Sequence, residues 1–411
     1  MTAIDKHIEA PKIAENDATS KQIRGSSLLA FGKFLSVGLN LATQVLLVRY
    51  LTKSDYGSWT YALAAVAFFQ TFSTLGLKRS ISRFLPIFHE KEEFDKLFGT
   101  IALAIATILI SGLIIITVVF ISPELISQLI SGNKQPALLL LILVFLVPVE
   151  AIDGLFIGIF ASFMRPGAIF FRKHVLAPLL KLAVVLLLIL LEKDVYFVAY
   201  GYLFGSLIGV LIYAKILSGL LHQQGLRQHL SLNSINIPFK EIFLFTIPLL
   251  SSDLLEILMH SMDTFILGYF HGTTEVAAYQ VVLPAARVNK MVMRSFALLY
   301  TPLLARLFAK NDYLEINNLY WRTTIWIAVM SFPIFLMTFS LAKPVTSFFY
   351  GERYESSWVF LQLLSFGYYL NVLLGFNSRT LTVLGKLRYI MIINLVVVIA
   401  NLIGNLLLIP R

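Results

Sequence analysis

Residues 97–120 read LFGTIALAIATILISGLIIITVVF, a run in which no side chain carries a charge. A helix rises about 1.5 Å per residue, so a run of this length can cross the roughly 30 Å hydrocarbon core of a bilayer. Runs of similar length and character recur along the chain. This pattern predicts several transmembrane helices.

The composition agrees with this interpretation. Of the 411 residues, 58% are apolar and 14% are charged, and the mean hydropathy is +0.80. Soluble domains contain about 45–50% apolar and about 25% charged residues. A compact water-soluble protein of this length has no place for so much apolar surface. The sequence therefore predicts an all-α, polytopic integral membrane protein.

Charged breaks divide the apolar runs into eleven candidate transmembrane segments, and the most polar interruption, residues 218–241, separates two halves of about six segments each. We expect a disordered cytoplasmic tail (1–26), an N-terminal lobe (27–217), a cytoplasmic linker (218–241) and an apparently truncated C-terminal lobe (242–411). The candidate segments are 27–48, 57–77, 97–120, 137–163, 168–191, 195–217, 242–268, 277–302, 321–342, 355–377 and 388–409.

The net charge of +10 does not indicate a nucleic-acid partner, because the basic residues are not gathered on one face or arm. Lys and Arg are roughly three times more numerous in the N-terminal tail and even-numbered loops than on the opposite side, which by the positive-inside rule predicts a cytoplasmic N-terminus. The absence of cysteine excludes disulfides, thiolate metal sites and cysteine catalysis.

Ionisable residues well inside the apolar segments are few, and each costs about 2.5–3.5 kcal/mol near the bilayer centre. Seven ionisable residues form two stripes with helical spacing. The stripe in segment 242–268 consists of Asp253, Glu256, His260 and Asp263, and the stripe in segment 277–302 consists of Arg287, Lys290 and Arg294.

A short loop near Gly272–Thr274 joins these two segments, so we expect them to run antiparallel. Folding back about this loop pairs Asp253 with Arg294, Glu256 with Lys290, and His260 with Arg287. A similar fold-back about Gly167 pairs Asp153 with Lys181.

Two interpretations of these charges stay open. They form structural ion pairs between helices, or they line a water-accessible cavity whose bases bind an anion. We favour the cavity, because so many charges in matching register exceed what helix packing needs. His260 is either a proton-coupling group or a residue that is hydrogen-bonded between helices.

Catalytic and cofactor motifs are lacking in the sequence. It has no phosphate-cradling glycine loop or Walker motif, and its seven histidines show no metal-ligand spacing. We therefore expect neither an enzyme nor a metal or cofactor site.

Several short motifs, in their order and spacing, resemble the bacterial polysaccharide flippase family of the multidrug/oligosaccharidyl-lipid/polysaccharide exporter superfamily. The resemblance covers residues 25–410. The motifs are Arg49-Tyr50-Leu51 with Tyr56-Gly57, Gly76-Leu77 with Arg83, Pro248, Asp263 with Gly268, Tyr279 with Arg287, Pro302 with Arg306, Gly385-Lys386, and Asn405 to Pro410.

This resemblance implies two six-helix lobes around a central cavity that opens alternately to each side of the inner (plasma) membrane. It implies flipping of a polyprenyl-diphosphate-linked oligosaccharide without ATP, with membrane lipid and a polysaccharide-assembly machinery as partners. Under this hypothesis Arg287, Lys290, Arg294, Lys33 and Lys181 bind the substrate. Asp153, Asp253, Glu256, His260 and Asp263 carry coupling ions or set the field of the cavity.

Two alternatives remain. A cation-coupled multidrug antiporter of the same fold would need a net acidic lining for its cationic substrates. A truncated, non-transporting membrane protein is suggested by the C-terminus, because family members usually continue beyond Pro410 with further helices.

Overall fold

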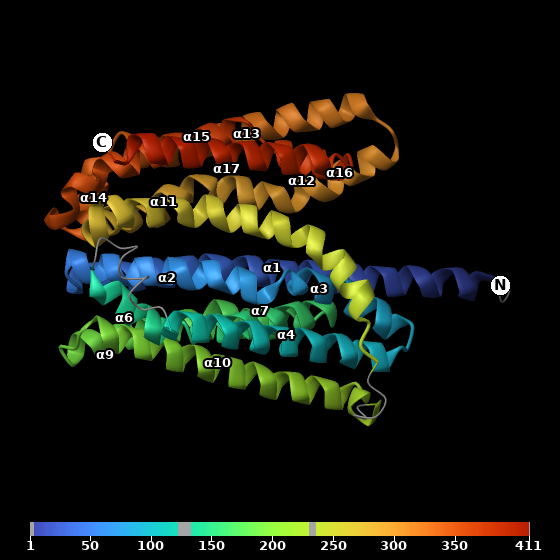
Figure 1. Cartoon of the computed structure of the whole chain (residues 1–411). Coiled ribbons are helices and arrows are strands. Elements are labelled where there is room, and N and C mark those ends of the chain that lie inside the picture. Colours follow the sequence, from blue (N-terminus) through green and yellow to red (C-terminus); the bar gives the residue numbers. More distant parts are fainter. Residues whose placement is uncertain (1–3, 122–132, 230–235, 411) are drawn as a thin grey trace. The chain divides into compact units, whose positions relative to one another are not determined.

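The computed structural model describes residues 4–121, 133–229 and 236–410 (Figure 1). Every regular element within these ranges is a helix, and no β-strand occurs in them. The all-α class predicted from composition is confirmed. In the first half the elements are α1 (Ile4–Tyr50), α2 (Lys53–Thr74), α3 (Leu77–Glu90), α4 (Phe94–Ile121), α6 (Lys134–Leu143), α7 (Leu146–Ser162), α8 (Pro166–Ile169), the π-helix η1 (Phe170–Leu176), α9 (Ala177–Leu190), α10 (Val195–Gln223) and η2 (Leu226–His229).

The second half is also helical throughout its described part. Its elements are α11 (Phe239–Arg287), η4 (Val288–Lys290), α12 (Met291–Ala309), α13 (Tyr313–Phe339), α14 (Ala342–Tyr350), η5 (Glu352–Ser357), α15 (Trp358–Leu373), α16 (Asn377–Val383) and α17 (Leu387–Leu408). At the other end of the chain, α1 begins at Ile4, within the segment for which the sequence predicts a disordered tail.

Among the described residues, seven helices are long and apolar enough to cross a membrane alone, and three bent pairs meet the same test as single crossings. One of these pairs, Phe239–Ile247 with Leu250–Ala297, includes the fold-back at Gly272. This pair therefore contains two of the eleven predicted segments. Counted as one crossing, it brings the number of candidate crossings among the described residues to at most ten instead of eleven. The polytopic architecture is confirmed.

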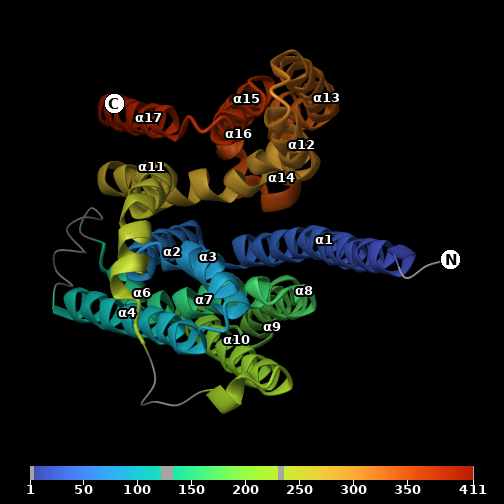
Figure 2. The same cartoon turned by 90° about the vertical axis from the view of Figure 1, so that its right-hand side faces the viewer.

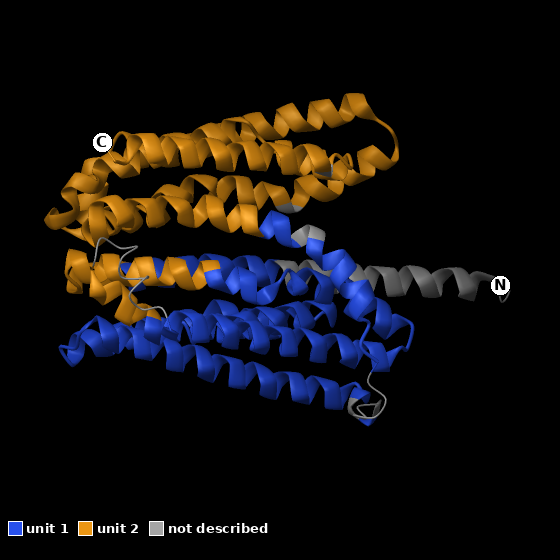
Figure 3. Cartoon of the chain, viewed as in Figure 1, with its two compact units in different colours: residues 1–44, 69–121, 141–253 blue, residues 45–68, 122–140, 254–411 orange. Residues whose placement is uncertain are grey.

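The chain divides into two compact units, coloured in Figure 3. Unit 1 comprises Met1–Gln44, Phe69–Ile121 and Leu141–Asp253, and unit 2 comprises Val45–Phe68, Ser122–Leu140 and Leu254–Arg411. In unit 1, α7 packs against α3, α4 and α10 (Figure 2). The buried residues of α3, which include Leu77, Ile81, Leu85 and Phe88, recur at helical spacing, and this apolar face joins the core of the unit.

In unit 2, α11 folds back on itself at Gly272, whose φ of 77° and ψ of −173° are accessible only to glycine. Across this hairpin Tyr279 donates to Asp263 at 3.0 Å and Gln280 donates to Thr264 at 2.6 Å. These contacts confirm the antiparallel arrangement predicted from the short loop.

Three interruptions break the helices of unit 1. A bend of 41° separates α2 from α3, where Leu75 and Gly76 both have positive φ, and a bend of 44° separates α6 from α7. The third interruption is η1, which precedes α9. Pro178 lacks an N–H, so it cannot donate the regular helical bond to the carbonyl of His174. In membrane proteins such irregular backbone occurs where it lines a cavity or is buried in protein.

Candidate functional site

A cavity of about 260 Å³ lies inside unit 1, and two of the three interrupted regions, η1 and the start of α3 after its break, contribute residues to its walls. Its lining residues are Gln70, Lys78, Glu150, Asp153, Gly154, Ile157, Arg172, Lys173, Ala177, Leu180, Lys181, Gly201, Tyr202, Gly205 and Ser206. Four of them are basic and two are acidic. Charged groups are expensive within a membrane-spanning unit, so a cluster of six marks a functional site by default.

Arg172 and Asp153 form the ion pair of this cavity, with 2.9 Å between Nη2 and Oδ1. The Arg172 side chain is only 5% exposed and the Asp153 side chain is 19% exposed. The guanidinium also lies over the ring of Tyr213, 5.7 Å from its centroid. A nearly dry pair of this kind is stable only because each charge compensates the other.

Asp153 forms its ion pair with Arg172 and not with Lys181 as predicted, because the chain folds back earlier than Gly167; Lys181 lies within electrostatic range of Asp153. The hydrogen bonds of the turn involve Phe163, Met164 and Arg165, so the centre of the fold-back lies about three residues before that glycine. Arg172 thereby comes opposite Asp153. Lys181 still lines the same cavity.

Lys181 occupies another wall of the cavity. Its Nζ lies 5.2 Å from the centroid of the Tyr202 ring, a cation–π contact. Glu150 lies within electrostatic range of Lys181 and, more weakly, of Arg172. The two acids of the cavity therefore each have a basic neighbour, and Lys78 and Lys173 remain as surplus positive charge.

Lys78 lies directly after the α2–α3 break, in the first turn of α3. The N-cap of α3 is Gly76, which has no side chain, so the amide groups of this turn receive no side-chain cap. At the end of α2 the Thr74 hydroxyl donates to the carbonyl of Thr71 at 3.1 Å. The break thus presents a helix N-terminus, with its partial positive charge, beside a lysine that lines the cavity.

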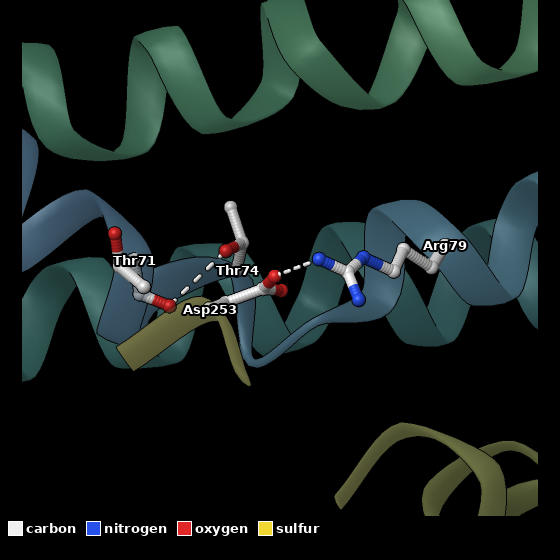
Figure 4. Close-up of polar contacts among 4 residues, drawn as sticks. All are labelled: Thr71, Thr74, Arg79 and Asp253. Carbon is white, nitrogen blue, oxygen red and sulfur yellow. Dashed lines mark hydrogen bonds and ion pairs between the residues drawn. The ribbon is translucent and has the colours of Figure 1, made fainter. Parts of the chain in front are cut away.

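Arg79, the residue after Lys78, is an ion-pair partner of Asp253. Figure 4 shows the guanidinium of Arg79 directed at the Asp253 carboxylate, with which it forms an ion pair. The sequence predicted that Asp253 would pair with Arg294. The structure instead gives Asp253 a partner from α3 of the same unit.

Lys33, predicted as a substrate-binding residue, lies on α1 beside η1. The two helices contact at Gly32, where any Cβ would lie 2.6 Å from the Phe170 ring, and at Ser36, whose hydroxyl is 3.2 Å from Nδ1 of His174. Lys33 is within electrostatic range of Lys173.

Unit 2 brings part of the second predicted constellation together. His260 lies within electrostatic range of Arg287, Glu256, Lys290 and Asp263. Lys290 in turn lies within electrostatic range of Arg287 and Arg294.

Asp263 accepts hydrogen bonds from two different helices. It accepts from Tyr279 at 3.0 Å and from Asn405 of α17 at 2.7 Å. Asn405 in turn donates to Asn401 at 3.2 Å.

The Nζ of Lys290 lies 4.6 Å from the centroid of the Tyr368 ring.

The sequence analysis missed Lys78, Arg172 and Lys173 as site residues. The signal was present as Arg172-Lys173-His174, three consecutive basic or titratable residues next to the apolar run that begins at Val175. The predicted segment 168–191 contains these residues, but they were not selected as charges well inside it. Within the described ranges, no group of three or more His, Asp or Glu side chains is placed to hold a metal ion.

Comparison with known proteins places the chain in a family. The model of the family described as "Polysaccharide biosynthesis protein" matches residues 23–308, and the MatE model matches residues 248–407. A putative O-antigen transporter of Shigella flexneri is 21% identical over 89% of this chain and 85% of its own length. The capsular polysaccharide biosynthesis protein CapF of Staphylococcus aureus is 26% identical, but the match covers 42% of this chain and 44% of CapF.

Solved structures show the same fold at low sequence identity. The lipid II flippase MurJ in an inward closed conformation aligns with a TM-score of 0.71 and 16% identity, over 92% of this chain and 80% of MurJ. An inward-facing MATE family transporter of the MOP superfamily aligns with a TM-score of 0.69 and 14% identity, over 88% and 83% of the two chains. Since one family model covers well over half of the residues, the chain belongs to the polysaccharide biosynthesis protein family.

Proposed function

We propose that this protein is a flippase that moves a polyprenyl-diphosphate-linked oligosaccharide from the inner to the outer leaflet of the plasma membrane, for synthesis of a cell-surface polysaccharide. The observation that carries the proposal is the cavity of unit 1, which is lined by four basic and two acidic residues inside a membrane-spanning bundle. A net positive polar interior suits an anionic headgroup.

The chemistry of such a substrate defines what the protein must supply. An oligosaccharide diphosphate cannot enter hydrocarbon without losing its hydrogen bonds to water, at a cost of several kcal/mol for each polar group. Its polyprenyl tail is apolar and can stay in the bilayer beside the protein. The protein therefore needs a polar, cationic path for the headgroup alone.

The membrane potential is a sufficient energy source for this movement. Moving two negative charges out of an inside-negative cell releases roughly 4–5 kcal/mol at ~100 mV. Cationic side chains neutralise the diphosphate during passage, so no nucleotide hydrolysis is needed. This reasoning assumes alternating access, with a cytoplasmic N-terminus as the positive-inside rule predicts.

We assign roles to the predicted residues on this basis. Lys33 and Lys181 in unit 1, and Arg287, Lys290 and Arg294 in unit 2, are proposed to bind the anionic headgroup. The acids Asp153, Asp253, Glu256 and Asp263, together with His260, are proposed to carry coupling ions or to set the field. A polysaccharide-assembly machinery is the expected partner that uses the flipped product.

A cation-coupled drug antiporter is the second candidate, and the MatE model match to residues 248–407 is the observation that favours it. Cationic drugs need acidic binding groups, and in the unit 1 cavity the acids are outnumbered. This alternative predicts efflux of cationic dyes that is lost when Asp253, Glu256 or Asp263 is neutralised.

The decisive experiment reconstitutes the full chain in proteoliposomes and measures the exposure of a fluorescent polyprenyl-diphosphate oligosaccharide to an impermeant quencher. Arg287→Ala and Arg294→Ala are compared with Lys310→Ala, which removes a lysine just after α12. We expect flipping by the wild type and the Lys310 variant, and a loss of at least tenfold in both arginine variants. Full flipping activity in both arginine variants would show that Arg287 and Arg294 do not bind the substrate. An inactive wild type that instead exports cationic dyes supports the antiporter, and one that transports neither substrate supports a non-transporting protein.

A further inference from the structure

We propose that α3 braces α11 across its bend, and that the ion pair between Arg79 and Asp253 is a latch that opens when the bend changes during transport. The inference rests on the proposed function, because it concerns the alternating access that flipping requires. It gives a positioning role to Arg79, a residue that sequence patterns did not select.

The first argument is that two helix interruptions adjoin each other. The α2–α3 bend of 41° includes Gly76, whose φ is 73°. The second interruption is the bend of α11 between Ile247 and Leu250. A Cβ at Gly76 would lie 3.1 Å from Cγ2 of Thr246 and 3.6 Å from the backbone nitrogen of Leu250. The α2–α3 break therefore contacts α11 on both sides of the α11 bend.

The second argument is that buried contacts join α3 to the part of α11 before the bend. Thr246 donates to the carbonyl of Ile242 at 2.7 Å, so its hydroxyl oxygen accepts from Ser80 of α3. All three residues are fully buried, and Ile242 belongs to the same apolar core as the buried face of α3. Phe84 packs edge-on against Phe245, with 5.6 Å between the ring centroids. We call these contacts the anchor, because they fix the start of α11 to the core of unit 1.

The third argument is that the contact beyond the bend is of a different kind. There the guanidinium of Arg79 forms the ion pair with Asp253 that Figure 4 shows. The Arg79 side chain is 45% exposed and the Asp253 side chain is 24% exposed, whereas the anchor is buried. A partly exposed ion pair contributes little to stability, because water solvates both charges when they separate. The latch can therefore open while the anchor holds.

Neighbouring residues of α3 thus bind α11 on both sides of its bend. Ser80 binds before the bend and Arg79 binds beyond it, so the bend angle is fixed while both contacts are made. Asp253 is also the last residue of α11 that belongs to unit 1, and the helix continues into unit 2 from Leu254. Hinge motions are absorbed by a few residues between rigid elements. Opening the latch leaves α11 anchored at Thr246 and lets the helix beyond the bend change direction.

This change of direction would act on groups that the proposed function uses. Beyond the bend, α11 carries Glu256, His260 and Asp263, which are proposed to carry coupling ions or to set the field. At the other end of the latch, Arg79 follows Lys78, which lines the cavity of unit 1. A displacement of the first turn of α3 therefore affects the cavity wall and the latch together.

Hydrogen–deuterium exchange of the purified full-length protein in detergent tests the latch. The measured quantity is the exchange rate of α11 backbone amides before the bend (239–246) and beyond it (250–256). Arg79→Gln and Asp253→Asn should each raise exchange beyond the bend about threefold, as expected for the loss of a partly exposed ion pair, and leave the first segment unchanged. The reversed pair, Arg79→Asp with Asp253→Arg, restores the attraction and should return the rate to that of the wild type.

The controls separate the latch from the anchor and from ion pairs in general. Lys343→Gln breaks another exposed ion pair, with Glu355, and should leave both rates unchanged. Ser80→Ala removes an anchor contact and should raise exchange before the bend. Wild-type exchange beyond the bend in both single charge variants overturns the latch. A reversed pair that exchanges as fast as the single variants overturns it as well, because the two charges then do not act on each other.

Cross-linking tests whether the latch must open for transport. The chain has no cysteine, so Arg79→Cys with Asp253→Cys can be joined by a short bis-thiosulfonate and released by a reductant. Joining should reduce lipid flipping in proteoliposomes at least tenfold, and reduction should restore it.

The matched pair joins the same two helices before the bend. It is Arg83→Cys with Phe245→Cys, where the guanidinium carbon lies 4.4 Å from the ring centroid. This pair should still flip lipid when it is joined, because the anchor is not expected to open. Undiminished flipping by the joined Arg79–Asp253 pair overturns the requirement for opening. If that pair is inactive before it is joined, the exchange rates decide.

The two measurements separate this inference from the proposed function. If the exchange rates change as expected but the wild type does not flip lipid, the latch stands and the flippase assignment fails. If the wild type flips lipid and the charge variants exchange like the wild type, the assignment stands and the latch fails.

Discussion

The guanidinium of Arg172 lies against the backbone of Gly209 on α10, in space that any Cβ at residue 209 would fill. Four residues further along the same helix, Tyr213 places its ring beside the same guanidinium. Gly209 thus lets Arg172 stay buried while it reaches Asp153. The absence of a side chain at Gly209 determines how a charged residue is held.

Gly209→Ala is therefore expected to displace the Arg172 guanidinium and to lower the thermal stability of the protein. Overpacking of this kind typically costs about 1–3 kcal/mol. The matched control is Gly219→Ala, which is also on α10 but meets no atom within 4 Å. This control should be neutral or stabilising, because alanine is favoured over glycine within a helix by about 1 kcal/mol. Equal melting temperatures for the two variants in detergent would show that Arg172 moves aside without loss.

Asp153→Asn should be more damaging, because it leaves the Arg172 charge buried without its partner. Breaking a buried ion pair by removing one member costs roughly 3–5 kcal/mol. The double variant Asp153→Asn with Arg172→Gln should recover part of this loss, since it removes the isolated charge. A double-mutant cycle on melting temperatures measures the coupling. Additive effects would contradict the pair.

The membrane topology can be tested cleanly because the chain has no cysteine. We expect Lys91→Cys, in the loop between α3 and α4, to face the cytoplasm. We expect Lys193→Cys, in the loop between α9 and α10, to face the opposite side. An impermeant maleimide added to intact cells should label the second variant but not the first. Inside-out vesicles should give the reverse pattern. Labelling of Lys91→Cys in intact cells would overturn the predicted orientation.

The sequence was sufficient to predict the helices and the antiparallel hairpin at Gly272. Long uncharged runs have few alternatives in a membrane, and a short loop between two such runs enforces the fold-back. The hydrogen bond from Tyr279 to Asp263 and the position of Arg287 within electrostatic range of His260 follow from this geometry. Periodicity alone was adequate for these residues because α11 is regular close to the glycine, between the bend at 247–250 and the start of η4 at Val288.

Periodicity failed where the helices are irregular. The π-helical turns of η1 and the break before α3 change the direction of side chains in ways that a 3.6-residue repeat does not represent. The pairing of Asp153 was misassigned because its turn lies at 163–165 and not at Gly167. The roles of Arg172 and Arg79 depend on long-range contacts, with Gly209 and Asp253 respectively, that no local pattern encodes.

The last prediction concerns Arg49 and Arg353 in unit 2. Arg353 caps α1, the helix that carries Arg49, and Arg49 caps α14, the helix that precedes Arg353. Arg353 donates to the carbonyl of Val48 at 2.6 Å and to that of Arg49, in the last turn of α1. Arg49 donates to the carbonyls of Phe348 and Phe349, in the last turn of α14. Basic groups at helix C-termini satisfy free carbonyls and interact favourably with the dipole.

Because the guanidinium group of Arg353 serves two carbonyls at once, Arg353→Lys should behave like Arg353→Ala and not like the wild type. Both bonds are donated by Nη2, which lies one bond further from the backbone than the Nζ of a lysine would. Each cap contributes about 0.3–1 kcal/mol at an exposed site, so we expect a loss of stability of about 1 kcal/mol for either variant. Lys343→Ala is the control on α14, where the exposed pair with Glu355 should contribute little. Full stability of Arg353→Lys in thermal unfolding would show that positive charge alone suffices and that the two-carbonyl geometry has no role.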